Sequence, residues 1–126
     1  VTDVTGFGLL GHSLEMARAS QAELTFFASR VPILPWAREY AALGLIPGGS
    51  HANRRFCEKH LQVDPGVSPV DLDLLSDAQT AGGLLAAMSP LDAPVYLERL
   101  QGRGVAQAAL VGEVTAAGAA RLQVLP

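Results

Sequence analysis

The spacing of apolar residues predicts a helix near the start of the chain. The residues that recur every three or four positions are Phe7, Leu10, Leu14 and Ala17. They fall on one face of a helix, which we expect over residues 8–19. The same periodicity, combined with capping, proline and glycine signals, predicts further helices. Three of them cover residues 35–43, 51–61 and 69–75, and the last begins between Ser89 and Pro94 and runs to about Gln101.

Alternating or continuous apolar runs predict four strands between these helices. Residues 22–28 alternate between apolar and polar positions, which is typical of a half-buried strand. The apolar run 84–88 follows paired glycines and is interpreted as an inner, central strand. Residues 105–114 are the third predicted strand, and residues 121–125 are an edge strand behind a turn near Ala117-Gly118.

The order of these elements predicts a two-layer α+β sandwich. Strands and helices interleave without the strict βαβ rhythm of a doubly wound sheet, so we expect a mixed four-stranded sheet with helices on one face. At 126 residues the chain fits a single domain, residues 1–126, and no internal linker marks a boundary. Within it, Trp36 and Tyr40 are expected in the core or in a domain contact rather than on a ligand. Leu97 and Leu100 are expected to be buried.

Charge and composition exclude several classes of function. Twelve acidic and nine basic residues leave a formal net charge of −3. The bases are scattered except for the pair Arg54-Arg55, which argues against nucleic-acid binding. No apolar run approaches the roughly 20 residues of a membrane-spanning helix. Cys57 is the only cysteine, so no disulfide framework or thiolate zinc site is expected, and the cytoplasm is the expected compartment.

The densest motif lies at the start of the chain, where Asp3 stands among threonines and glycines. Its neighbours are Thr2, Thr5, Gly6 and Gly8. Mg²⁺ is usually held by one or two carboxylates with waters and phosphates, so Asp3 is a candidate ligand for a hard cation. An equally good interpretation is that Asp3 caps the first helix. Such a motif is expected at a joint within a longer protein, and residues 1–5 are then expected to lack firm contacts within this chain.

Two further motifs combine glycines with polar residues. The first consists of Gly48, Gly49, Ser50 and Asn53, followed by Arg54-Arg55. Such a segment can bind an anion, but Ser50 as the N-cap of the helix at 51–61 is the favoured interpretation. The second consists of Asp77, Gln79, Thr80, Gly82 and Gly83. Its carboxylate is a candidate ligand, although an Asx-type turn ahead of the strand is favoured.

The remaining titratable residues form no recognisable site in the sequence. His12, His51 and His60 lie on two separate predicted helices, with no second histidine four residues away, which argues against zinc. His12 is interpreted as a helix-face residue. Cys57 lacks a neighbouring motif that would activate a thiolate, so it is interpreted as a packing residue. No catalytic residue is therefore assigned in this chain.

Taken together, the three motifs closely resemble the C-terminal domain of selenophosphate synthetases (selenide, water dikinases). The resemblance rests on Thr2-Asp3-Val4-Thr5-Gly6-Phe7-Gly8-Leu9-Leu10-Gly11-His12, on Pro47-Gly48-Gly49-Ser50 with Asn53, and on Asp77-Ala78-Gln79-Thr80-Ala81-Gly82-Gly83-Leu84-Leu85. The motifs occur in the family's order, and the resemblance covers nearly the whole chain. Three positions depart from the family pattern: Ser50 stands where Thr is usual, Ala78 where Pro is usual and Ala81 where Ser is usual.

The resemblance implies a function for a longer protein. Members of this family are homodimeric enzymes that make selenophosphate, AMP and phosphate from ATP, selenide and water. In them the aspartate that matches Asp3 binds Mg²⁺ at the ATP site. Most other ligands, and the catalytic Cys or selenocysteine, belong to an N-terminal domain, and Cys57 matches none of them. The implied cofactor is Mg²⁺, and the implied partners are ATP, selenide and that N-terminal domain. The alternative is a free-standing, non-catalytic binding or assembly module of the same fold.

Overall fold

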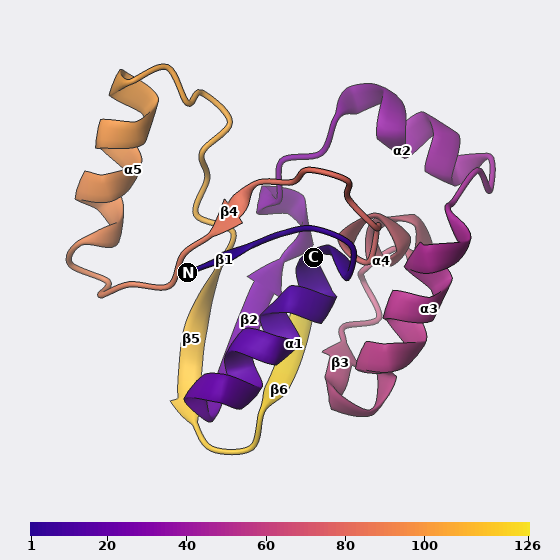
Figure 1. Cartoon of the computed structure of the whole chain (residues 1–126), viewed down its shortest axis with the longest axis horizontal. Helices are drawn as coiled ribbons and strands as arrows, with labels where there is room; N and C mark the ends of the chain where they lie inside the picture. The colour runs from indigo at the N-terminus through magenta and orange to yellow at the C-terminus, as the bar shows by residue number, and fades with distance from the viewer.

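A mixed four-stranded sheet with helices packed beside it forms the frame of the computed structural model (Figure 1). The structure describes residues 1–126, apart from the side chain of Ala116. The strands are β1 (Thr2–Asp3), β2 (Ala22–Phe27), β3 (Leu61–Val63), β4 (Leu84–Leu85), β5 (Gly112–Ala117) and β6 (Arg121–Leu125). The helices are α1 (Gly8–Ser20), α2 (Pro35–Ala42), α3 (Gly48–Cys57), α4 (Pro69–Leu75) and α5 (Ala93–Gly102), with short 3-10 helices at η1 (Ala28–Arg30) and η2 (Glu58–His60).

The main sheet has the strand order β3-β6-β2-β5. In it, β6 runs parallel to both β3 and β2, while β5 is antiparallel to β2. The helix α1 lies against β2 and β6 (Figure 1). The chain is therefore an α+β protein with a mixed four-stranded sheet, which confirms the predicted fold class.

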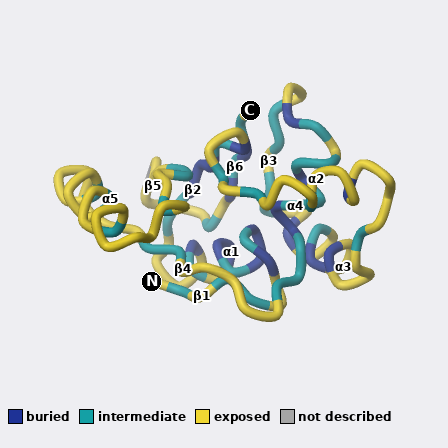
Figure 2. Tube along the Cα trace, turned by 90° about the horizontal axis from the view of Figure 1, so that it is seen from above, coloured by how far each residue is buried: buried dark blue, intermediate teal, exposed yellow. Residues whose placement is uncertain are grey.

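The hydrophobic core lies between α1 and the sheet. Leu10 and Leu14 of α1 belong to one buried cluster with Leu24 of β2 and with Leu122 and Val124 of β6. Burying a Leu or Val side chain contributes about 1.5–3 kcal/mol. Figure 2 shows buried positions along α1, β2 and β6, whereas α5 has no buried residue and is mostly exposed. This packing fixes the position of α1, whose N-terminal end carries the first motif.

The position of β6 corrects the prediction of an edge strand. It lies between β3 and β2, and its residues Leu122 and Val124 are buried. The sequence pattern did not predict β3, which pairs with the outer side of β6, because residues 51–61 were predicted as one helix. Instead α3 ends at Cys57, and the chain continues through η2 into a three-residue strand. Three residues are too few for an alternating pattern to show in the sequence.

The apolar run at residues 84–88 is not a central strand. Only Leu84 and Leu85 form β4, which pairs with β1 in a separate two-stranded sheet, and the Leu84 side chain is 76% exposed. Hydrophobicity alone does not distinguish such a run from an inner strand. The same pairing gives residues 1–5 contacts within the chain, contrary to expectation. The predicted strand over residues 105–114 is also displaced, because β5 begins only at Gly112.

Apart from α3, the helices begin and end close to their predicted bounds. On α2, Trp36 and Tyr40 are both about half exposed and pack edge to face against each other, so they are not part of this chain's core. No residue of α5 is fully buried, which contradicts the prediction for Leu97 and Leu100. None of the helices formed by the described residues has the length and apolar character needed to cross a lipid bilayer.

Candidate functional site

The three sequence motifs come together at the N-terminal end of α1. Residues 2–8 lead into α1, residues 48–53 form the start of α3, and residues 77–83 run from the end of α4 to β4. Each of these segments forms hydrogen bonds with both of the others. We refer to the three segments together as the motif junction. Residues far apart in the sequence are therefore neighbours here.

Asn53 joins α3 to the segment before α1 and to the end of α4. Its side chain is buried, and its Nδ2 donates to the carbonyl oxygens of Gly6 at 2.9 Å and Ser76 at 3.1 Å. An amide nitrogen carries two hydrogens, so both bonds can form at once. The sequence assigned no role to Asn53, and these contacts make it a bridge between two backbone segments.

We expect the Asn53→Ala variant to unfold at a lower urea concentration than the unchanged chain. Alanine leaves two carbonyl oxygens without their buried donor, and an unsatisfied buried group costs about 1–3 kcal/mol. Arg55→Ala, at an exposed position of the same helix, is the matched control. It should change the free energy of unfolding by less than about 0.5 kcal/mol. Coincident urea midpoints, followed by circular dichroism, would contradict the bridging role.

Ser50 is not the N-cap of α3, contrary to prediction, because the helix begins at Gly48 and includes Ser50. Its buried hydroxyl donates to Asp77 Oδ1 at 2.8 Å, and Gln79 Nε2 donates to Asp77 Oδ2 at 2.7 Å. The backbone N–H of Gln79 donates to the Thr5 carbonyl oxygen, so the expected Asx-type turn at Asp77 is not formed either. Both carboxylate oxygens of Asp77 therefore accept hydrogen bonds within the junction.

Two glycines of the junction are required by close approach of the backbone. Gly8 has a φ of +68°, and a Cβ at this position would lie 2.7 Å from backbone atoms of Ser76. A Cβ at Gly82 would overlap the Val4 carbonyl oxygen. Side chains larger than hydrogen do not fit at either place. The other glycines of the junction have open space or an ordinary contact at the Cβ position: Gly6, Gly48, Gly49 and Gly83.

Asp3 lies in β1, opposite Leu84 of β4. The capping interpretation is wrong, because α1 is preceded by Phe7 and has no side-chain cap. The Asp3 side chain is exposed, and its carboxylate accepts no hydrogen bond from the described residues. Thr2 donates to the backbone carbonyl oxygen of Asp3, at 3.3 Å, and Thr80 is exposed. Asp3 is thus the motif residue whose carboxylate faces solvent.

The junction can supply one ligand to a magnesium ion, the Asp3 carboxylate, but not a complete binding site. Among the described residues, no three of the types His, Cys, Asp and Glu are grouped closely enough to hold a metal ion. Mg²⁺ commonly keeps several waters and binds through one or two carboxylates plus substrate phosphates. The exposed Asp3 carboxylate, on a strand held by backbone pairing, is compatible with that chemistry.

Cys57 and Arg54, which are also candidates from the sequence, both lie on α3 and contact other parts of the fold. Cys57 is fully buried, and burial raises the pKa of its thiol to about 11 against a smaller opposing effect of Arg18. A thiol of this kind is protonated near neutral pH, and Cys57 belongs to the buried core cluster, as expected of a packing residue. Arg54 donates to Asp73 at 2.8 Å and so joins α3 to α4.

His12 lies outside the three segments but contacts the first of them. It was interpreted as a helix-face residue, but its side chain is largely buried and contacts Thr5 and Phe7. The available signal was the spacing of three between His12 and Glu15, which lets two side chains meet on one helix face.

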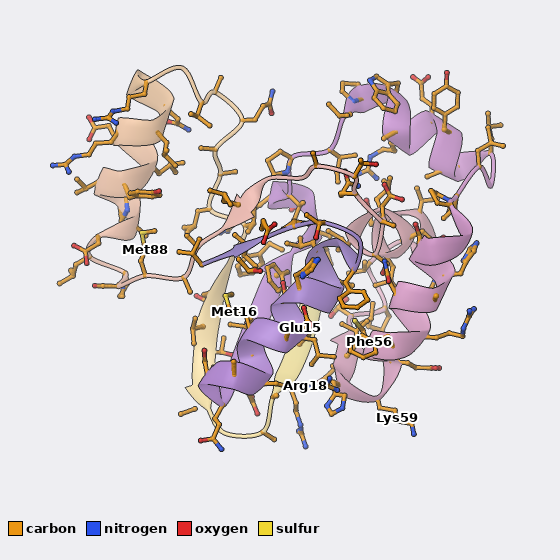
Figure 3. All side chains as sticks on the ribbon, in the orientation of Figure 1. Glu15, Met16, Arg18, Phe56, Lys59 and Met88 are labelled. Carbon is orange, nitrogen blue, oxygen red and sulfur yellow. The ribbon has the colours of Figure 1, made fainter. Side chains whose placement is uncertain are left out.

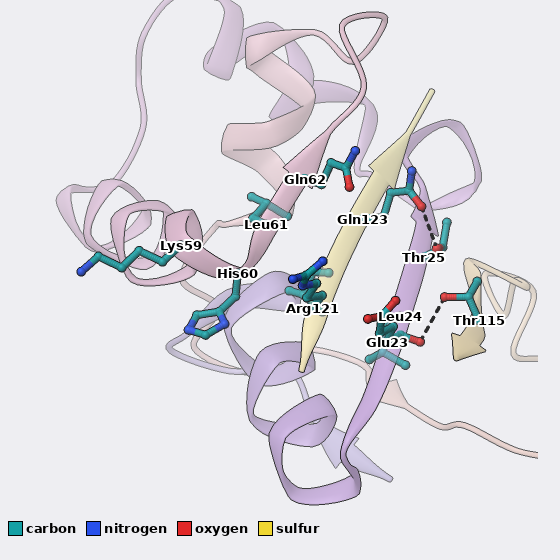
Figure 4. A pocket seen from close by; sticks show the side chains of 11 residues that line it. Glu23, Leu24, Thr25, Lys59, His60, Leu61, Gln62, Thr115, Arg121 and Gln123 are labelled. Atoms are coloured by element: carbon teal, nitrogen blue, oxygen red, sulfur yellow. Dashed lines mark hydrogen bonds between the residues drawn. The ribbon is translucent and has the colours of Figure 1, made fainter. Parts of the chain in front are cut away.

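Two cavities in the described part of the chain lie away from the junction. One, of about 270 Å³, opens on β2, β3 and β6, and its lining includes the charged residues Glu23, Lys59 and Arg121 (Figure 4). The other, of about 490 Å³, lies beside α3 and includes Arg55 and Asp64. Neither is lined by a residue of the predicted site. The candidate site is therefore the exposed face of the junction rather than a pocket.

Comparison with known proteins gives one family and a consistent set of relatives. Residues 1–125 match the family described as AIR synthase related protein, C-terminal domain. A selenide, water dikinase of Nitratidesulfovibrio vulgaris (strain DSM 19637 / Miyazaki F) is 57% identical over 89 residues, which are 71% of this chain and 25% of the relative. One of Clostridioides difficile (strain 630) is 38% identical over 125 residues, 99% of this chain and 36% of the relative. One of Pelobacter propionicus is 45% identical over 113 residues, 90% of this chain and 32% of the relative. The chain thus spans about a quarter to a third of the length of these relatives.

Proposed function

Because this chain belongs to the family of AIR synthase related proteins, C-terminal domain, we propose that it is the C-terminal domain of a selenide, water dikinase. The full-length enzyme makes selenophosphate, AMP and phosphate from ATP, selenide and water. Support comes from the relatives of that name, one of which aligns with 99% of the chain. The chain covers only part of each relative, so we propose that it supplies only part of the active site.

The observation that carries the proposal is the exposed carboxylate of Asp3 at the motif junction. Its strand is held by pairing with β4, and the Val4 backbone N–H donates to the Gly83 carbonyl oxygen at 2.8 Å. The carboxylate is thus presented from a defined position and forms no hydrogen bond with the described residues. Mg²⁺, when bound, neutralises charge on the phosphates of ATP, and Asp3 is one of the residues that hold it.

Exposed apolar residues around α2 and α5 support contact with a further domain. They are Leu34, Trp36, Tyr40, Leu43 and Leu45 around α2, and Leu91, Val95 and Tyr96 around α5. A ten-residue helix with no buried side chain, such as α5, is marginal in water unless something covers its apolar face. We therefore expect the N-terminal domain to cover these residues in a full-length homodimer.

The proposed function is tested on the full-length protein. With ATP, Mg²⁺ and selenide it should form selenophosphate and AMP in equal amounts, measured by ³¹P NMR and chromatography. If no selenide-dependent AMP is formed, the proposed function is wrong.

The 126-residue chain alone should form neither product under the same conditions. One carboxylate cannot orient and neutralise a triphosphate without the other ligands. The matched control is the full-length protein assayed in the same solution. Turnover by the 126-residue chain would refute the division of the active site between two domains.

A further inference from the structure

His12 connects α1 to the segment before it through both ring nitrogens. Its Nε2 lies 3.0 Å from Thr5 Oγ1 and 3.4 Å from the backbone nitrogen of Phe7. Its Nδ1 lies 3.1 Å from Glu15 Oε2, three residues further along α1. The His12 side chain is only 14% exposed. An imidazole with three polar contacts and this degree of burial is held in one orientation.

These contacts determine where the proton of the neutral ring lies. The N–H of Phe7 can only donate, so Nε2 of His12 must offer its lone pair. The proton then sits on Nδ1 and is donated to the Glu15 carboxylate. Glu15 therefore selects the tautomer in which Nε2 accepts from the segment before α1.

Aromatic packing holds the same segment from its other side. The ring centroid of Phe7 lies 5.5 Å from that of His12 and 5.8 Å from that of Phe56. Arg18 of α1 lies over the Phe56 ring, 5.3 Å from its centroid, and Figure 3 shows both residues where α3 faces α1. The chain from Thr5 to Phe7 is thus fixed between two helices.

The backbone of this segment leads directly to Asp3. The Thr5 carbonyl oxygen accepts from the backbone N–H groups of Gly8 at 2.9 Å and Gln79 at 3.1 Å. The side-chain hydroxyl of Thr5 contacts His12 Nε2. Asp3 lies only two residues before Thr5, so the place of its carboxylate depends on how firmly Thr5 is held.

We propose that His12, oriented by Glu15, is a positioning residue that holds residues 4–7 against α1 and so sets the position of the Asp3 carboxylate. In one respect this rests on the proposed function, namely that Asp3 binds Mg²⁺. The contacts of His12 with the segment do not depend on that function.

The variants His12→Gln and His12→Phe separate the hydrogen bonds from the bulk of the side chain. Glutamine keeps an acceptor near the position of Nε2, whereas phenylalanine keeps a ring without an acceptor. Amide hydrogen exchange of residues 2–8, measured by mass spectrometry on the 126-residue chain, should be roughly tenfold faster in His12→Phe. It should stay close to the original rate in His12→Gln. Peptides from β6, measured in the same sample, show whether the core is intact.

Glu15→Gln is the matched control, because its amide oxygen still accepts from Nδ1–H of His12. It should leave the exchange of residues 2–8 unchanged. Equal exchange in His12→Phe and the unchanged chain would overturn the inference.

The second measurement is the Mg²⁺ affinity of the full-length enzyme with a non-hydrolysable ATP analogue, determined by calorimetry without turnover. His12→Phe should weaken the Mg²⁺ affinity roughly tenfold, because a residue that orients a metal ligand is lost. His12→Gln should keep most of the original affinity. At saturating Mg²⁺ the kcat should stay near that of the unchanged enzyme. Faster exchange with unchanged Mg²⁺ affinity would mean that His12 only stabilises the fold, and would overturn the inference.

Failure of the proposed function appears separately, as absence of selenide-dependent AMP formation by the unchanged enzyme.

Discussion

Replacing Asp3 with alanine in the full-length enzyme should lower ATP turnover at limiting Mg²⁺ on the order of 100-fold. The carboxylate is exposed on β1 and accepts no hydrogen bond from the described part of the chain. Its expected contribution is therefore electrostatic and directed at the cation and the phosphates. The measurement is the initial rate of AMP formation as a function of Mg²⁺ concentration.

Two controls separate this effect from a loss of structure. The free energy of unfolding of Asp3→Ala should stay within about 0.5 kcal/mol of the unchanged protein, as at other exposed positions. Asp3→Asn keeps the size of the side chain but not its charge, so it should lose nearly as much activity as Asp3→Ala. If both variants keep the original rate and Mg²⁺ dependence, Asp3 is not a metal ligand.

The Gly82→Ala variant should destabilise the chain by about 1–3 kcal/mol and loosen β1. The added Cβ would overlap the Val4 carbonyl oxygen, so β1 would have to move away from β4. The overlapping atom belongs to the backbone, and no flexible side chain can yield in its place. Because β1 carries Asp3, the same variant should also lower the activity of the full-length enzyme.

The adjacent Gly83→Ala variant is the matched control for this effect. A Cβ at Gly83 would meet no atom within 4 Å, and its carbonyl oxygen still accepts from the Val4 N–H. Urea denaturation of the 126-residue chain should therefore distinguish two neighbouring glycines, with Gly82→Ala unfolding at the lower concentration. Equal midpoints would contradict the tight approach of residues 82 and 4.

The motif residues divide into two groups according to what their polar atoms contact. Ser50, Asn53 and Asp77 use these atoms within the junction, whereas the Asp3 carboxylate points outward. Segments that resemble ligand sets in the sequence therefore form hydrogen bonds that join three distant parts of the chain. The chemistry that we propose depends on the one carboxylate that this framework leaves exposed.

The sequence by itself was sufficient for the elements whose signals are local. The helix predicted over residues 69–75 is α4, where Ser68 Oγ accepts from the Asp71 backbone N–H at 3.1 Å and Pro69 stands at the first helical position. The apolar stripe of α1 likewise predicted its buried face, because Leu10 and Leu14 lie in the core. The motifs also sufficed to indicate the family, since they need only residue types in a certain order.

Only the tertiary structure decided which segments lie side by side. The inner place of β6 depends on β3, and the short pairing of β4 depends on β1. The sequence predicts Ser50 as a cap, but the structure shows that its hydroxyl donates to Asp77, 27 residues away. It likewise predicts His12 only as a helix-face residue, and the structure places Thr5 beside it. Helix periodicity and capping arise from interactions among residues a few positions apart. Strand pairing and hydrogen bonds between loops depend on the packing of the whole chain, which leaves no periodic pattern in the sequence.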